Sequence, residues 1–220
     1  MNIAIDGPAG AGKSTIARRA AKEMGFIYVD TGAMYRAVGL YMLNNDVNVE
    51  DEVAVSEAVA NVVVDLAYEG DEQQILLNGE NVNGLIRTPK VSAAASKTSA
   101  YPAVRARLLD LQKNIAANNS VLMDGRDIGT VVLPNAELKI FLTASAEVRG
   151  ERRYKELIAK GEKADLSSII ADIEKRDEQD RNRAVSPLVQ AEDAVLVDTS
   201  NMTIDEVVNH IIELKNSVCK

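Results

Sequence analysis

The sequence predicts an α/β fold whose core is a parallel sheet, with a small antiparallel sheet inserted into it. The first observation that predicts this fold lies at the start of the chain, where an apolar strand at 2–5 leads through a glycine-rich loop into an amphipathic stretch at 14–24. The second sign is a set of apolar runs without alternation, at 121–123, 138–142 and 194–197. Strands covered on both faces have this pattern, which is typical of parallel sheets.

The amphipathic stretch at 14–24 predicts a helix that ends at Gly25, and a second strand follows at 26–29. The last helix should begin at Thr203, because Thr203 and Glu206 have the spacing of a capping box. The three later apolar runs are each followed by a polar residue. The polar residues are Asp124, Thr143 and Asp198. They follow the carboxyl ends of the strands, where open parallel sheets bind their ligands.

A segment at 62–87 departs from the pattern of strands and helices that is typical of a parallel α/β fold. Two stretches at 62–66 and 74–77 look like antiparallel strands, and Asn78-Gly79 is a strong signal for a hairpin turn. We therefore expect a single domain over residues 1–220, with a small insert at about 60–105, and not two independent domains.

The composition of the chain restricts the kinds of partner that it can bind. The chain has 220 residues and a formal net charge of −8, so at long range it repels nucleic acid and anionic lipid. An anionic ligand must be bound by a local group of cations. The single cysteine, Cys219, cannot form an intrachain disulfide, and neither a signal peptide nor a run of 18 apolar residues is present. We expect a cytoplasmic monomer that binds small molecules, no nucleic acid and no membrane.

The glycine-rich loop satisfies the Walker A pattern of P-loop proteins in full. Glycines let backbone N–H groups approach phosphate oxygens, and the following helix adds the positive end of its dipole. In this pattern Lys13 binds the β- and γ-phosphates of ATP, and the Ser14 hydroxyl ligates Mg²⁺. The predicted ATP-binding residues are Gly7, Pro8, Ala9, Gly10, Ala11, Gly12, Lys13, Ser14 and Thr15.

A P-loop alone does not identify a reaction, but the polar segments of the chain narrow the range of P-loop proteins to which it could belong. No Asn-Lys-x-Asp guanine signature occurs, which disfavours a GTPase. Arginines suit a cleft that takes two phosphorylated substrates, since the guanidinium fork binds phosphate in a bidentate way. Asp124 is either the acid that orients Mg²⁺ through water or a structural residue at a strand end. The arginines in question are Arg36, Arg126, Arg176, Arg181 and Arg183.

Four segments together resemble the bacterial cytidylate kinases. They are Ile5-Asp6-Gly7-Pro8-Ala9-Gly10-Ala11-Gly12-Lys13-Ser14-Thr15, Asp30-Thr31-Gly32-Ala33-Met34-Tyr35-Arg36, Asp124-Gly125-Arg126-Asp127-Ile128-Gly129-Thr130-Val131-Val132 and Arg176-Asp177-Glu178-Gln179-Asp180-Arg181-Asn182-Arg183. The resemblance covers essentially the whole chain. It implies a nucleoside monophosphate kinase fold, with a P-loop core, an antiparallel insert in the monophosphate-binding region and a mobile lid near 149–165.

The resemblance also implies roles for individual residues. Lys13, Arg126 and Arg183 would act in catalysis. The residues implied for the acceptor CMP are Thr31 in contact with the nucleotide, Arg36 at its phosphate, Ser96, Arg105 and Asp127 at the cytosine, Arg126 at the phosphate, Arg176 and Asp180 at the ribose, and Arg183 at the phosphates.

The predicted reaction is the transfer of a phosphoryl group from ATP to CMP or dCMP, with Mg²⁺. One rival is a P-loop kinase for another nucleotide or a small metabolite. A second rival is a non-catalytic protein that binds ATP as a switch, and such a protein would not need the arginines. A panel of nucleoside monophosphates separates these functions.

Overall fold

The computed structural model describes residues 1–70 and 72–218, so Cys219 lies outside the described residues. The chain forms two compact units. The first unit combines residues 1–26 with residues from 122 onward, and the second runs from Ile27 to Val121.

The first unit is built on a parallel sheet. Within the described residues the larger sheet has five strands, and four of them lie here in the order β6 (Val121–Gly125), β1 (Asn2–Asp6), β7 (Leu138–Thr143) and β8 (Val195–Asp198). β1 runs parallel to β7, with Ile5 opposite Ile140, and β7 runs parallel to β8. The predicted parallel α/β core is confirmed.

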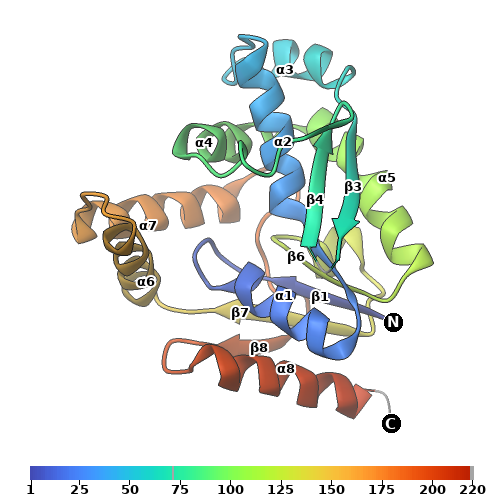
Figure 1. The fold of residues 1–220 in the computed structure, drawn as a ribbon, viewed down its shortest axis with the longest axis vertical. Helices are drawn as coiled ribbons and strands as arrows, with labels where there is room; N and C mark the ends of the chain where they lie inside the picture. Colours follow the sequence, from blue (N-terminus) through green and yellow to red (C-terminus); the bar gives the residue numbers. More distant parts are fainter. Residues whose placement is uncertain (71, 219–220) are drawn as a thin grey trace. The chain divides into compact units, whose positions relative to one another are not determined.

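The helices of this unit pack in pairs. α1 (Lys13–Met24) lies beside α8 (Ile204–Val218), and α6 (Ala146–Ala159) lies beside α7 (Leu166–Asn182) (Figure 1). Gly25 ends α1 with a φ of 69°, as expected of a glycine in this position. The capping box at the start of α8 is also confirmed, because the Thr203 N–H donates to Glu206 and the Glu206 N–H donates back to Thr203 Oγ1. A single π-helical turn, η1 (Ile128–Val132), follows β6.

One expectation for this sheet is wrong. β8 was expected to be covered on both faces, yet Val195 is 37% exposed and Leu196 is 56% exposed. β8 lies at the end of the strand order, next to β7. An apolar run has the same appearance in an edge strand as in a central strand, so the sequence pattern could not distinguish the two.

The second unit contains the predicted insert. It begins with β2 (Ile27–Asp30), and its antiparallel sheet has the order β3 (Val64–Glu69), β4 (Glu72–Leu77), β5 (Glu80–Asn81). Asn78 and Gly79 both have positive φ, 49° and 87°, as the two-residue hairpin turn requires. The helices are α2 (Thr31–Asn44), α3 (Glu52–Val59), α4 (Pro89–Thr98) and α5 (Pro102–Asn118).

Close packing joins α2 to α4 in this unit (Figure 1). A Cβ atom at Gly39 would lie only 2.8 Å from the backbone nitrogen of Ala95, so the absent side chain lets the two helices approach. The cores of both units are largely aliphatic. No helix within the described ranges is long and apolar enough to cross a membrane.

Candidate active site

The P-loop connects β1 to α1. Gly7 has a φ of 150°, and a Cβ atom there would overlap the carbonyl oxygen of Leu142 on β7. Gly12 has a φ of 83° at the N-cap of α1. Both positions therefore need glycine, and the sequence pattern has glycine at both.

Lys13 occupies the first position of α1 and is only 6% exposed. Its Nζ donates hydrogen bonds to the carbonyl oxygens of Gly7, at 2.7 Å, and Pro8, at 2.8 Å. Burial, followed by the charge of Arg126, holds the pKa of Lys13 well below its ordinary value, while Asp124 and Asp6 oppose the shift. A phosphate group beside Nζ would favour the protonated form, so this lysine is suited to an anionic ligand.

Ser14, the predicted Mg²⁺ ligand, lies against Asp124 in the structure. The Ser14 hydroxyl donates to Asp124 Oδ2 at 2.9 Å, and Asp124 is buried near the end of β6. Hydroxyl and carboxylate oxygens are the hard ligands that Mg²⁺ prefers, so these two residues fit the ion. Among the described residues no cluster of three or more His, Cys, Asp or Glu could hold a metal. An ion at this position would therefore need oxygen ligands from the bound nucleotide or from water as well.

Sequence reasoning missed Asp6, the last residue of β1. Its carboxylate accepts the backbone N–H groups of Ile128, at 2.8 Å, and Gly129, at 2.7 Å. Burial raises the pKa of Asp6 to about 6, although both hydrogen bonds oppose the shift. Asp6 thus joins the strand that leads into the P-loop to the turn that follows Arg126 and Asp127.

The loop after β6 is also joined to the end of α7 by two ion pairs. Arg126 Nε lies 2.8 Å from Asp180 Oδ2, and Arg183 Nη2 lies 3.5 Å from Asp127 Oδ1. The structure therefore brings together four of the residues predicted for CMP. Arg176, a fifth, lies on α7 with its side chain exposed.

A buried pair that was not predicted from the sequence links α6, α7 and the P-loop. Arg149 Nη2 donates to Asp177 Oδ2 at 2.6 Å, and its Nη1 donates to the carbonyl oxygen of Ala9 at 2.9 Å. Both side chains are almost wholly buried. An open cavity of about 630 Å³ lies beside this pair, and it is lined by Pro8, the 143–146 segment and residues of α7 that include Glu174, Glu178 and Arg181.

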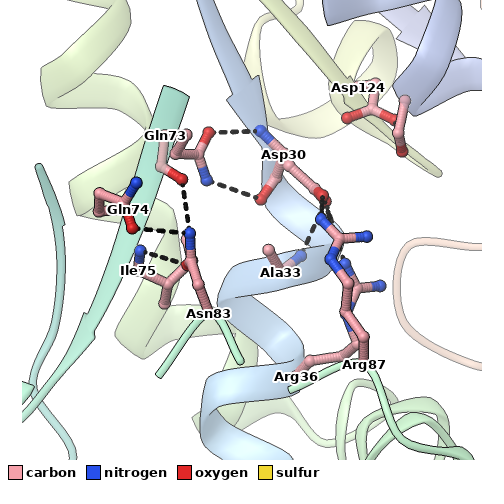
Figure 2. A network of polar contacts seen from close by, with 10 residues as sticks. Asp30, Ala33, Arg36, Gln73, Gln74, Ile75, Asn83, Arg87 and Asp124 are labelled. Atoms are coloured by element: carbon pink, nitrogen blue, oxygen red, sulfur yellow. Dashed lines mark hydrogen bonds and ion pairs between the residues drawn. The ribbon is translucent and has the colours of Figure 1, made fainter. Parts of the chain in front are cut away.

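The remaining predicted residues lie in the second unit. Thr31 is buried at the start of α2, and Ser96 is half-buried on α4. Arg105 is buried, with its guanidinium 5.7 Å from the centre of the Tyr35 ring. Arg36 Nη2 lies 3.3 Å from Asp30 Oδ2, within a network of polar contacts that Figure 2 shows.

Comparison with known proteins gives this constellation a family. The family model described as cytidylate kinase matches residues 3–217. The chain belongs to the cytidylate kinase family. It is 51% identical to the cytidylate kinase of Carboxydothermus hydrogenoformans, over 99% of this chain and 100% of that protein. It is 53% identical to that of Desulforamulus reducens, over 96% of this chain and 94% of the relative.

A solved structure supports the fold. A protein of uncharacterised function from Eubacterium ventriosum aligns with a TM-score of 0.55 at 12% identity, over 99% of both chains. Identity this low supports the fold alone. The predicted family and the predicted α/β fold class are confirmed, whereas the roles of individual residues stay predictions.

Proposed function

We propose that this member of the cytidylate kinase family transfers the γ-phosphoryl group of ATP directly to the phosphate of CMP or dCMP. Its activity follows from the family: the chain is a phosphotransferase that phosphorylates CMP with ATP. A non-catalytic ATP switch is not favoured. Within the molecule, the P-loop supports this function most directly, because the buried Lys13 side chain donates hydrogen bonds to carbonyl oxygens of that loop.

The reaction needs positioning and charge neutralisation more than acid–base chemistry. The acceptor phosphate oxygen is already anionic, so no general base is required, and the attacking and leaving oxygens must lie roughly in line. Lys13 would neutralise charge on the transferred group. Arg126 and Arg183 would hold the phosphates. The ion pair of Arg126 with Asp180 at 2.8 Å supports this role, because it fixes the Arg126 guanidinium group.

We assign the Mg²⁺ site to Ser14 as a ligand and to Asp124 as the carboxylate that orients a metal-bound water. Their contact at 2.9 Å supports this assignment. When bound, Mg²⁺ would neutralise negative charge on the β- and γ-phosphates.

The acceptor residues are assigned as the family resemblance implies. Asp127, Arg105 and Ser96 would recognise cytosine, Arg36 would bind the acceptor phosphate, and Thr31 would contact the nucleotide. Arg176 and Asp180 would contact the ribose. The burial of Arg105 and Asp127 supports a polar pocket, in which a base that fails to pair leaves buried groups unsatisfied. The net charge of −8 supports small-molecule partners and no nucleic acid, and we propose a cytoplasmic monomer.

The test is an ADP-release assay with ATP, Mg²⁺ and each common nucleoside monophosphate. We expect CMP and dCMP to be good acceptors, UMP a poor one, and AMP and GMP inactive. Lys13→Ala should retain less than about a tenth of the turnover, given the size of such electrostatic effects, while Lys22→Ala on the same helix should stay near wild type. If AMP proved the preferred acceptor, the cytosine assignments would be wrong.

A further inference from the structure

A carboxylate shared by two arginines lies at the start of α2. Asp30 Oδ2 is 3.3 Å from Arg36 Nη2 and 3.4 Å from Arg87 Nη2, and Asp30 Oδ1 accepts the backbone N–H of Ala33 at 2.8 Å (Figure 2). Sequence reasoning singled out Arg36 and gave Arg87 no role. The two guanidinium groups nevertheless converge on one oxygen atom.

These contacts leave Arg36 incompletely satisfied and hold Arg87 only loosely. Charge-assisted N–H···O bonds are usually about 2.7–2.9 Å long, so pairs at 3.3 and 3.4 Å are loose. Some ion pairs elsewhere in the molecule are tighter, such as Arg126 with Asp180 at 2.8 Å. Two guanidinium groups also carry far more N–H donors than one carboxylate can accept. Within the described residues, the buried Nε of Arg36 has no hydrogen-bond partner.

The antiparallel insert holds this carboxylate in place. The Gln73 side chain on β4 accepts the Asp30 N–H at 2.8 Å and donates to the Asp30 carbonyl oxygen at 3.5 Å. The Asn83 side chain in turn donates to the Gln73 carbonyl oxygen at 2.9 Å and accepts the Ile75 N–H at 2.8 Å (Figure 2). Asp30 is therefore fixed through both its backbone and its side chain.

The backbone beside Arg87 is anchored, whereas the Arg87 side chain is accessible to solvent. The preceding residue, Ile86, is 1% exposed and donates its N–H to the Val82 carbonyl oxygen. The Arg87 side chain itself is 58% exposed. Together, Arg36, Arg87 and Asp30 carry a net charge of +1, which suits a dianionic phosphate monoester.

We propose that Arg87 is a further acceptor-binding residue, which contacts the phosphate of CMP together with Arg36 and is oriented by Asp30. The inference rests on the proposed function, because the acceptor phosphate is the anion expected beside Arg36. Both Nη2 atoms lie within 3.5 Å of the same carboxylate oxygen, so the two guanidinium groups are close enough to contact one phosphate.

The experiment measures CMP and ATP affinity by titration calorimetry for wild type, Arg87→Ala and Lys90→Ala. Lys90 is an exposed cation three residues farther along, at the start of α4, so its removal changes the net charge equally. Arg87→Ala should weaken CMP binding by at least about tenfold, as expected for the loss of a charge-assisted contact, and should leave ATP affinity and the melting temperature unchanged. Lys90→Ala should match wild type within about twofold.

Several results would overturn the inference. If Arg87→Ala bound CMP within about twofold of the wild-type affinity, Arg87 would not contact the CMP phosphate. An equal loss in Lys90→Ala would indicate a general charge effect, and an equal loss of ATP affinity would indicate a structural role. Wild-type turnover with CMP tests the proposed function separately, so a protein active on CMP but insensitive to Arg87→Ala would contradict this inference alone.

Discussion

Asp6 illustrates how a single buried residue couples two loops of the site. Its two carboxylate oxygens accept two consecutive backbone N–H groups, from Ile128 and Gly129. Hydrogen bonds of this kind favour the ionised carboxylate, whereas burial disfavours it. Burial is the larger effect here, and the pKa of Asp6 rises from 3.8 to about 6.

This shift predicts a specific dependence of stability on pH. Because the folded chain keeps the Asp6 proton to a higher pH than the unfolded chain, the contribution of Asp6 to the free energy of unfolding is complete below pH 3.8 and is lost as the pH rises through about 6. Asp6→Asn removes the titration. The free energy of unfolding of wild type minus that of Asp6→Asn should therefore fall between about pH 4 and pH 7, by up to about 3 kcal/mol.

Urea unfolding of both proteins across this pH range provides the measurement. The subtraction removes the titration of carboxylates that both proteins share. A difference that grows with pH would mean that the two backbone hydrogen bonds outweigh burial, and that the pKa of Asp6 is lowered in the folded protein.

At this scale, some of the site could be predicted from sequence. Lys13 and Ser14 belong to a short contiguous pattern, and the structure places the Ser14 hydroxyl against Asp124. The contacts of Asp6 and Arg149 could not be predicted in the same way. They join residues 122 and 140 positions apart in the chain, and a single sequence carries no signal for such pairs.

α6 and the turn that follows it are the elements for which a lid is proposed. The start of α6 is anchored, because Arg149 is buried against Asp177 and the P-loop. Later side chains are exposed, with Lys155 at 77% and Lys160 at 57%, and Gly161 has a φ of 76°. We therefore expect mobility in the second half of α6 and in the turn, where little burial opposes opening.

Limited trypsin digestion tests this lid, since the segment contains Arg152, Arg153, Lys155, Lys160 and Lys163. A lid should close fully only with both substrates, because its cations gain phosphate partners on closure and water must be excluded during transfer. An ATP analogue and CMP together should slow cleavage in this segment far more than either ligand alone.

Cleavage at Lys113, an exposed residue of α5, provides an internal control for the protease. Equal cleavage rates in the segment with both ligands and with none would show that it is an ordinary solvated helix. Its intrahelical pairs, such as Lys160 with Glu156, would then serve only the helix surface.

Most elements were predictable because their signals are local. The Asn78-Gly79 turn, the Gly25 helix end and the Thr203 capping box each depend on a few neighbouring residues, and all three are confirmed. The exposure of β8 depends instead on its place in the strand order, and that is a property of the whole sheet.

The whole molecule is acidic, yet its proposed substrates are anions. With a net charge of −8, it offers CMP no long-range attraction, so binding must come from local cations and a polar base pocket. The arginines predicted for CMP are divided between the two units: Arg36 and Arg105 lie in the second, and Arg126, Arg176 and Arg183 lie in the first. Such a molecule should discriminate among nucleotides by the base, because every nucleoside monophosphate carries a similar phosphate charge.

Thermal unfolding measures this discrimination without turnover. A ligand that binds only the folded state at about a hundred times its Kd adds about 2.7 kcal/mol to the free energy of unfolding. For a chain of this length that corresponds to a rise in Tm of about 5–10 °C. CMP should produce this rise, UMP at the same concentration a smaller one, and GMP, which matches CMP in phosphate charge and ionic strength, almost none. An equal rise with GMP would mean that the phosphate alone provides the affinity, and the cytosine-recognising roles of Asp127, Arg105 and Ser96 would have to be withdrawn.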